Sequence, residues 1–269
     1  MVRSKILKSN ASDQRSDQPC NRVFEVKPGR AVVAKYMATR RPVKKTRPQL
    51  VGVIASAADL RFASRMNEPP DLFELRLDCL VDVLDQVEKR LSILSGRRGE
   101  PAPIIITARD PREGGIGNLS LRKRRDLLER FLDHAKYIDV ELRSARAFKS
   151  LLARARKQNV RRILSFHNFE STPSTRSLRA KASLAKTHGA DVFKVACRFD
   201  SPAQLARLVD FVLEKKAGLP VSAMGIGKLG AASRLLLARC GSALTYGSLQ
   251  RSLVEGQLPI DLLRSALLH

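Results

Sequence analysis

From residue 50 onward, the chain alternates short apolar runs with longer stretches that mix apolar and charged residues. Short continuous apolar runs are typical of strands buried on both faces of a parallel sheet. The stretches between them have the mixed character of amphipathic helices. We therefore predict helices that alternate with strands over 50–56, 71–77, 103–109, 137–142, 160–167, 190–196, 220–226 and 242–248.

This alternation is typical of βαβ units, in which neighbouring strands run parallel. Eight such units in about 220 residues predict a (β/α)8 TIM barrel near the small end of that fold's usual size. The rival architecture is a doubly wound open sheet, which seldom needs so many strands in so short a chain. The expected fold class is therefore α/β, with a barrel domain over residues 49–269.

Residues 1–48, which precede the barrel, are basic and lack apolar periodicity. A segment with dense charge cannot bury enough apolar surface to fold alone, so we expect a disordered N-terminal extension. The whole chain has a net charge of +24, which invites comparison with nucleic-acid-binding proteins. Because the charge is divided between this extension and many helix faces, and no RNA-binding signature or zinc finger accompanies it, we expect only non-specific nucleic-acid contact by the extension.

The composition narrows the class of protein further. Hydrophobic residues make up 43% of the chain, which is typical of a globular protein. No apolar run reaches the roughly 18 residues that a membrane span requires, so no membrane partner is expected. Four scattered cysteines fit neither a disulfide framework nor a zinc site, which favours a cytoplasmic protein: Cys20, Cys79, Cys197 and Cys240.

Polar residues recur late in successive predicted strands or in the loops that follow them. They are Glu74 and Arg76, Arg109 and Glu113, Asp139 and Glu141, His167, and Lys194. Active sites of α/β barrels lie at the carboxyl ends of the strands. Any one of these residues alone could form a structural ion pair, but their recurrence at one end of the sheet predicts a common site.

Lys194 stands out because the strand around it is otherwise apolar, and lysine is rarely buried unless it is paired or used. A neutral amine attacks carbonyls and forms a Schiff base, and a nearby histidine can then remove a proton from the adjacent carbon. We therefore predict lyase chemistry on a carbonyl substrate, with Lys194 as nucleophile and His167 as acid–base group. Either Glu113 or Glu141 could orient the histidine. The structural alternative is a lysine that reaches the rim or pairs with Glu141.

A series of motifs, in this order, resembles the type I 3-dehydroquinate dehydratase family from about Leu50 to the C-terminus. The motifs are "ELRLD" (74–78), "TARDPREGG" (107–115), "YIDVEL" (137–142), "FHNFESTP" (166–173), "ADVFKVA" (190–196) and "AMGIGKLGAASR" (223–234). The resemblance implies an enzyme of the shikimate pathway that converts 3-dehydroquinate to 3-dehydroshikimate and forms a homodimer. It implies no metal or organic cofactor, because the lysine supplies the electron sink.

The resemblance also assigns roles to three residues in the chemical steps. Lys194 would form the imine with the C3 ketone of the substrate. His167 would take a proton from C2 and deliver one to the departing C1 hydroxyl. Glu113 would support the histidine.

Substrate binding is assigned, by the same resemblance, to residues at two places in the site. The ring hydroxyls would be bound by Glu74, Arg76 and Arg109, and the carboxylate by Arg234 and Gln257. The family's usual S-A-P-G-Q is "LVEGQ" at 253–257 here. Leu253 therefore replaces a carboxylate-binding hydroxyl, unless Ser252 substitutes for it, and Glu255 adds a negative charge nearby. Arg198 also stands where a methionine is common.

Two alternatives from other classes stay open. Another Schiff-base class I lyase or aldolase on a barrel would share Lys194, but not the whole set of Glu74, Arg76, His167 and Arg234. A basic binding protein with a decayed site is the second alternative, although every residue expected to do chemistry is present. Salt-dependent nucleic-acid binding that survives deletion of residues 1–48 would favour it.

Overall fold

Each apolar run forms a strand in the computed structural model, which describes residues 47–94, 96, 100–214 and 216–268. The strands are β1 (Gln49–Ile54), β2 (Leu72–Arg76), β3 (Ile104–Thr107), β4 (Tyr137–Glu141), β5 (Arg161–Asn168), β6 (Val192–Arg198), β7 (Val221–Ile226) and β8 (Leu244–Ser248). They form one sheet in the order β7-β6-β5-β4-β3-β2-β1-β8, and every pair in it is parallel.

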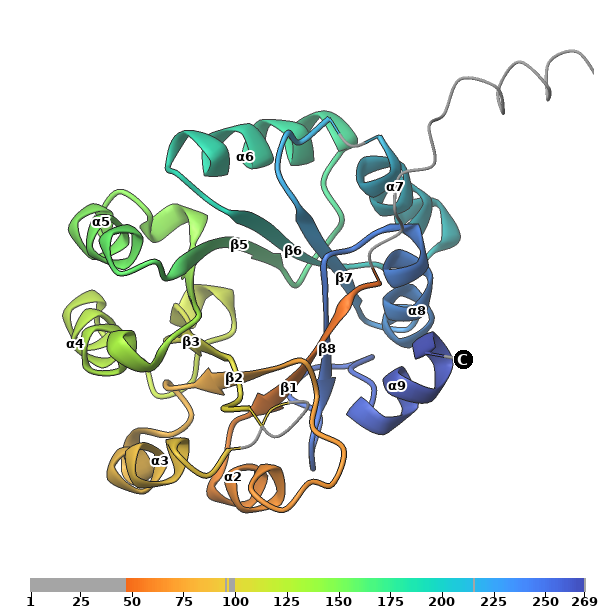
Figure 1. The fold of residues 1–269 in the computed structure, drawn as a ribbon. Helices are drawn as coiled ribbons and strands as arrows, with labels where there is room; N and C mark the ends of the chain where they lie inside the picture. Colours follow the sequence, from red (N-terminus) through yellow and green to blue (C-terminus); the bar gives the residue numbers. More distant parts are fainter. Residues whose placement is uncertain (1–46, 95, 97–99, 215, 269) are drawn as a thin grey trace, which may run out of the picture. The chain divides into compact units, whose positions relative to one another are not determined.

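The two ends of this sheet, β7 and β8, are joined by hydrogen bonds around Ser242. The backbone N–H of Ala243 donates to the carbonyl of Val221 at 2.7 Å, and the Ser242 hydroxyl accepts from Ala223 N–H at 2.9 Å. These contacts close the sheet into a barrel, as Figure 1 shows from one end. The predicted (β/α)8 barrel is therefore confirmed, and the doubly wound alternative is wrong because an open sheet has no such seam.

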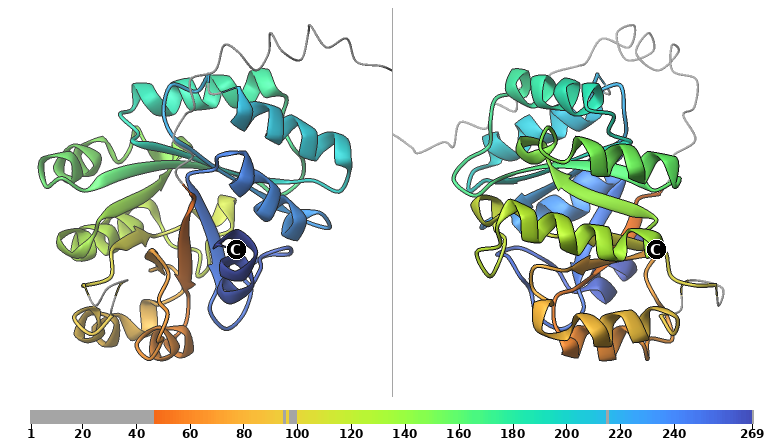
Figure 2. Two further views of the ribbon diagram at one scale, coloured as in Figure 1. Left: turned by 45° about the vertical axis from the view of Figure 1, so that its right-hand side comes forward. Right: turned by 90° about the vertical axis from the view of Figure 1, so that its left-hand side faces the viewer.

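Helices surround the strands on the outside of the barrel (Figures 1 and 2). They are α2 (Ala57–Ala63), α3 (Leu84–Leu91), α4 (Leu121–Phe131), α5 (Lys149–Lys157), α6 (Thr175–Thr187), α7 (Pro202–Leu213), α8 (Gly230–Cys240) and α9 (Ile260–Leu268). Short 3-10 turns are η1 (Val81–Val83), η3 (Pro111–Glu113), η4 (Leu132–His134) and η5 (Leu142–Ser144). Ser56, Ser120 and Ser174 begin α2, α4 and α6, because each serine side chain accepts a backbone N–H in the first helical turn.

The alternation of side chains along each strand separates two apolar layers. On β6, Phe193 and Val195 point outward into the core between sheet and helices, whereas Val192 and Ala196 belong to the cluster inside the barrel. Lys194 lies between these two inward residues in a strand whose period is two, so its side chain also points inward. This geometry explains why a lysine is tolerated in so apolar a strand.

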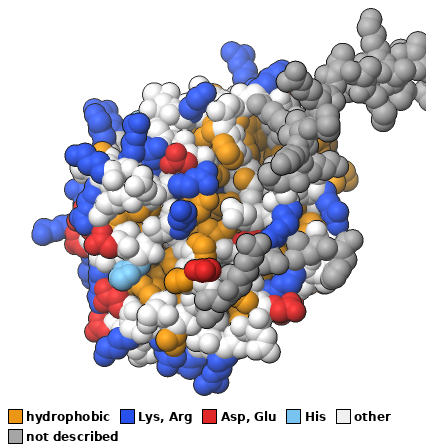
Figure 3. All heavy atoms as spheres, in the orientation of Figure 1, with side chains coloured by type: hydrophobic (Ala, Val, Ile, Leu, Met, Phe, Trp, Pro, Cys, Tyr) orange, Lys and Arg blue, Asp and Glu red, His pale blue; other side chains and the backbone are white. Residues whose placement is uncertain are grey.

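The predicted N-terminal extension, residues 1–48, lies almost wholly outside the described residues. The described residues all belong to one unit of the chain, Lys45–His269, in which Arg47 donates to both carboxylate oxygens of Asp71 at 2.7 and 3.0 Å. On the face drawn in Figure 3, Lys and Arg side chains are spread over the surface and do not gather in one patch. In the described part of the chain, no helix combines the length and apolar character needed to span a bilayer.

Candidate active site

Polar side chains from several strands converge on one cavity at the carboxyl ends of the barrel strands, where parallel strands bring distant residues together. Every residue to which a catalytic or substrate-binding role was assigned lines this cavity: Glu74, Arg76, Arg109, Glu113, His167, Lys194, Arg234 and Gln257. The remaining walls are mostly apolar and include Val53, Phe169, Ala196, Met224, Ile226, Tyr246, Leu253 and Val254.

The Lys194 amine is buried and held between two carboxylates and an aromatic ring. Its Nζ donates to Asp139 Oδ2 at 2.9 Å and to Glu74 Oε1 at 3.2 Å, and it lies 3.9 Å from the centroid of the Tyr246 ring. The alternative pairing with Glu141 is wrong, because the structure pairs Lys194 with these two other acids. A buried amine with two acceptors is fixed in direction, and it points into the cavity.

His167 forms a close pair with Glu113. Oε2 of Glu113 accepts the backbone N–H of His167 at 2.9 Å and lies 3.0 Å from its Nδ1. Burial raises the pKa of Glu113 to about 7. Burial, together with the charges of Arg109 and Lys194, lowers the pKa of His167 well below its usual value, so the imidazole is neutral near pH 7. Of the two acids that could have oriented the histidine, Glu113 does so.

The short turn that carries Glu113 is built by the residues around it. The Asp110 side chain caps η3 by accepting the N–H of Arg112 at 2.9 Å, and the Asp110 carbonyl accepts Glu113 N–H at 2.8 Å. Gly115 packs so closely on the Arg109 carbonyl that a Cβ would lie 2.2 Å from that oxygen. In the "EGG" sequence, Glu113 is therefore required for its contact with the histidine and Gly115 for the close packing of the turn.

A buried ionic network lies directly beneath the cavity. The Arg109 guanidinium donates to Asp139 at 3.0 and 3.2 Å, to Glu141 at 3.0 Å and to the Ser165 hydroxyl at 2.7 Å. Burial opposes ionisation of Asp139, but Arg109 and Lys194 outweigh it and hold the pKa of Asp139 below its ordinary value. Arg109 thus links β3 to β4 and β5 and fixes the acid that contacts the lysine.

Arg76 and Arg234 differ in their partners. Arg76 donates to both oxygens of Asp78 at 2.7 and 3.0 Å and to the carbonyl of Gly114 at 3.2 Å. Arg234 donates to the backbone carbonyls of Gly256 at 2.9 Å and Tyr246 at 3.0 Å, and among the described residues it pairs with no carboxylate. Burial therefore lowers the pKa of Arg234 to about 10.

The 252–257 segment closes the β7–β8 side of the cavity. Gln257 Oε1 accepts the N–H of Leu253 at 2.8 Å, and the Ser252 hydroxyl donates to the Gln257 carbonyl at 2.9 Å. The Leu253 side chain lines the cavity, whereas Ser252 is bound within its own segment. Gly256 packs against Gly230 at the start of α8, where a Cβ on Gly256 would lie 2.6 Å from the Gly230 Cα.

Two residues that contact Lys194 had no role assigned from the sequence. Asp139 was predicted to belong to the common site at the strand ends, but its contact with the lysine was not foreseen. Tyr246 lies in the middle of β8, with a buried hydroxyl that has no hydrogen-bond partner in the described part of the chain. The stretch "GSALTYGSL" that contains it belongs to the family motif that follows "AMGIGKLGAASR", but no role was assigned to Tyr246 from the sequence.

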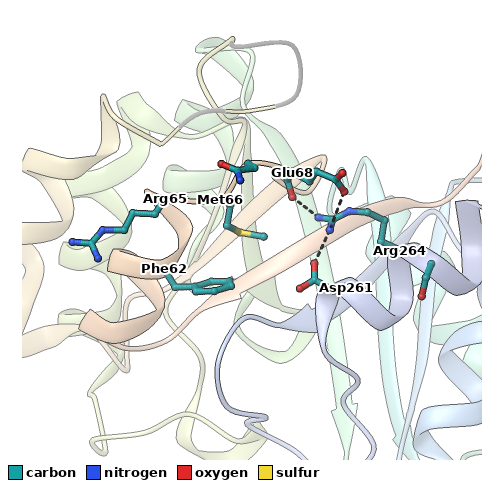
Figure 4. A pocket seen from close by; sticks show the side chains of 8 residues that line it. Phe62, Arg65, Met66, Glu68, Asp261 and Arg264 are labelled. Atoms are coloured by element: carbon teal, nitrogen blue, oxygen red, sulfur yellow. Dashed lines mark hydrogen bonds and ion pairs between the residues drawn. The ribbon is translucent and has the colours of Figure 1, made fainter.

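A second hollow lies between the loop after α2 and helix α9, and Figure 4 shows it from close by. Arg264 donates to Asp261 at 2.6 Å and lies 3.7 Å from Glu68, so the charges that line the hollow largely pair with one another. Among the described residues, no group of three or more His, Cys, Asp or Glu side chains is arranged to hold a metal ion. The cavity around Lys194 is therefore the candidate active site.

The fold and this cavity define a class: a (β/α)8-barrel enzyme with a buried lysine amine and a histidine–carboxylate pair in one site. A family model described as type I 3-dehydroquinase matches residues 53–269, and the chain belongs to this family.

Relatives and solved structures agree with this assignment. The chain is 35% identical over 226 residues to the 3-dehydroquinate dehydratase of Shouchella clausii (strain KSM-K16), covering 81% of this chain and 88% of that protein. It is 34% identical over 207 residues to the enzyme of the same name from Geobacillus sp. (strain WCH70), covering 74% and 79%. The crystal structure of 3-dehydroquinate dehydratase from Geobacillus kaustophilus HTA426 superposes with a TM-score of 0.73 at 30% identity, covering 82% of this chain and 90% of that one.

Proposed function

We propose that this protein dehydrates 3-dehydroquinate to 3-dehydroshikimate through a Schiff base on Lys194, as an enzyme of the shikimate pathway toward chorismate and the aromatic amino acids. One observation carries the proposal: in a chain of the type I family, the Lys194 amine and the His167–Glu113 pair face the same cavity. Because ion pairs with Glu74 and Asp139 would already stabilise the buried lysine, the proposal rests on the convergence of the two groups on one cavity and not on burial alone.

Lys194 acts as the nucleophile. Its amine first gives up a proton, for which Glu74 is the adjacent acceptor, because Arg109 and Lys194 keep Asp139 ionised. The neutral amine attacks the C3 ketone, and loss of water from the adduct leaves a protonated imine. The Asp139 carboxylate and the face of the Tyr246 ring then flank the positive nitrogen, which stabilises it. The imine draws electrons from C2, so the chain itself supplies the electron sink.

His167 moves the protons. Because Glu113 holds Nδ1–H, Nε2 is the basic nitrogen, and it removes the proton from C2 to give an enamine. The enamine electrons then expel the C1 hydroxyl, which takes the same proton from His167 and leaves as water. Hydrolysis of the resulting conjugated imine restores Lys194 and releases the product, so the net reaction is the loss of one water.

Arg234 and Gln257 bind the substrate carboxylate. The argument is electrostatic: a buried guanidinium whose described partners are all backbone carbonyls gains a counter-charge from an anionic ligand. Glu74, Arg76 and Arg109 lie on the other side of the cavity and are proposed to hold the ring hydroxyls. Leu253 supplies no hydroxyl to the carboxylate, and we expect this to weaken substrate binding more than it affects the chemistry.

Borohydride trapping tests this proposal. Sodium borohydride added with 3-dehydroquinate should reduce the imine, abolish activity and leave a mass increment on the peptide that contains Lys194. Lys194→Met should neither trap nor turn over, whereas Lys228→Ala, which removes an exposed lysine, should trap like the wild type. Formation of the conjugated product should be followed by its enone absorbance. An adduct on another lysine, or turnover without any adduct, would contradict the Schiff-base mechanism.

A further inference from the structure

Among the described residues, the largest fully buried side chain is that of an arginine on α4. Arg124 is 2% exposed, and its guanidinium reaches from the outer helix layer to the ends of β3 and β4. It does not line the cavity, and the proposed mechanism does not use it. A buried guanidinium is stable only with well-placed acceptors, so its contacts indicate what it holds.

Arg124 binds three acceptors on two neighbouring segments, the one that follows β3 and the end of β4. Nε donates to the Ala108 carbonyl at 2.8 Å, one terminal nitrogen donates to Asp110 Oδ2 at 2.9 Å, and the other makes a short contact to Glu141 Oε2. Its plane also lies 5.3 Å from the Phe148 ring centroid, which packs it from the α5 side. A planar fork is needed to satisfy divergent acceptors of this kind, and a lysine amine cannot reproduce it.

The two acids that Arg124 holds both shape the turn that carries Glu113. The remaining oxygen of Glu141 accepts the N–H of Asp110 at 2.9 Å and the guanidinium of Arg109 at 3.0 Å. Asp110 in turn caps η3 with its side chain and accepts the Glu113 N–H with its carbonyl. Arg124 therefore fixes both Glu141 and Asp110, and Asp110 in turn holds the backbone of Glu113.

We propose that Arg124 is a positioning residue that acts from outside the cavity, through Asp110 and Glu141, to hold Glu113 against His167. This inference rests on the proposed function, because it concerns the residues that move protons in it. A small displacement of a catalytic group weakens proton transfer while leaving the distant nucleophile in place. Arg124 should thus influence the steps of His167 and leave imine formation by Lys194 largely intact.

The charge of Arg124 gives the proposal a second, independent signature. The charged groups that face Glu113 are Glu141, Arg109 and Arg143, and the titratable group beside it is the neutral imidazole of His167. Removal of the positive charge of Arg124 leaves the negative charge of Glu141 less compensated. A more negative neighbour raises the pKa of Glu113, so the acid limb of the pH–rate profile should move to higher pH.

Paired substitutions on α4 test the proposal. Arg125 is the matched control, because it lies on the same helix and 5.7 Å from the same Phe148 ring, but donates to the Ala147 carbonyl and contacts neither acid. Turnover should be expressed per site that borohydride traps on Lys194, so that only folded protein is counted. Arg124→Lys should lower kcat about 10- to 100-fold, a part of what an acid–base group contributes, with KM nearly unchanged. Arg124→Met should lower kcat similarly and also move the acid limb upward, whereas Arg125→Lys and Arg125→Met should do neither.

A second route covers the case in which the Arg124 variants do not fold. Asp110→Asn keeps the size of the side chain but removes the charge that Arg124 binds, and it should also lower kcat per trapped site. The positioning role would be overturned if the Arg124 variants kept the wild-type kcat and an unmoved acid limb. It would also be overturned if Asp110→Asn kept the wild-type kcat. Failure of the proposed function would be seen in the wild-type protein, which would then neither form a borohydride-trapped adduct nor turn over 3-dehydroquinate. In that case both proposals would be wrong.

Discussion

The two sides of the cavity are built in different ways. On the β3–β5 side, which comprises Arg109, Glu113, Asp139 and His167, buried charged groups contact one another directly and each has several partners. On the β7–β8 side, which comprises Arg234, Gln257 and residues 252–256, contacts run to backbone groups. The ion pair on that side, between Arg198 and Glu255, is longer at 3.4 Å and is partly exposed.

This difference indicates how each side tolerates change. A buried ionic network fails when one partner is lost, because a charge is left without compensation in a region of low dielectric. Contacts between a side chain and backbone carbonyls do not depend on the sequence of the segment that supplies the carbonyls. The departures from the family pattern at Leu253 and Glu255 lie on the β7–β8 side, whereas Asn168, which stands where the family usually has an aspartate, follows His167 on β5. Substitutions on the β3–β5 side should therefore lower kcat, and those on the β7–β8 side should mainly raise KM.

The largest effect within this comparison is expected from His167→Ala. Loss of a general acid–base group should lower kcat about 10²- to 10⁴-fold, with little change in KM. Imine formation should persist, because Lys194 is held by Glu74 and Asp139 and not by the histidine. Single-turnover kinetics with borohydride quenching would measure both quantities in one experiment. If the variant turned over at the wild-type rate, His167 would be structural.

A smaller effect with the opposite signature is expected from Arg234→Lys. Hydrogen bonds to charged groups contribute about 1.5–3 kcal/mol, so loss of the guanidinium fork should raise KM roughly 10- to 100-fold. The value of kcat should change much less, because Arg234 contacts neither Lys194 nor His167 within the described residues. Steady-state kinetics with 3-dehydroquinate would measure KM and kcat of the variant separately. A fall in kcat as large as that of His167→Ala would contradict the division between the two sides.

The pH dependence sharpens the description of the β3–β5 side. Burial raises the pKa of Glu113 to about 7 and lowers that of His167. Below about pH 7 Glu113 is protonated and no longer stabilises positive charge on the imidazole, so kcat/KM should fall about tenfold per pH unit. Glu113→Gln imitates the protonated carboxyl, and its activity should be low with no acid limb near pH 7. An unchanged limb in that variant would assign it to another group.

How far the sequence predicts this molecule depends on the kind of interaction involved. The strands and the barrel follow from apolar runs, and the inward direction of Lys194 follows from the two-residue period of β6. The positions of Glu113 and Glu141 near strand ends left either acid open as the partner of His167, and only the family resemblance selected Glu113. The observed pairing depends on a turn built by Asp110 and on an arginine from α4, which are contacts between distant residues. The contact of Tyr246 with Lys194 was not predicted for a simpler reason, since an aromatic residue in a strand usually belongs to the core.

The smallest effect, and the finest test of the β7–β8 side, concerns the ion pair between Arg198 and Glu255. The two side chains are 35% and 53% exposed, and exposed pairs contribute about 0.2–1 kcal/mol, which corresponds to at most about a fivefold change in affinity. Arg198→Met removes both a contact that holds the 252–257 segment and a positive charge near an anionic substrate. Both losses raise KM, so we expect an increase of a few-fold at low salt.

Glu255→Gln should change KM less than Arg198→Met does, because its two consequences oppose one another. The 252–257 segment loses a contact, which raises KM, but a negative charge near the substrate carboxylate is also removed, which lowers it. Asp200→Asn is the control, since Asp200 contacts the same arginine at 3.0 Å but lies outside the segment. Added salt should erase the differences between these variants and the wild type, because exposed charges are screened over about 10 Å at 0.1 M ionic strength. The comparison would be contradicted if KM of Arg198→Met rose more than about tenfold, or if the rise persisted at high salt. Either result would mean that the β7–β8 side depends on a specific ionic contact, as the β3–β5 side does.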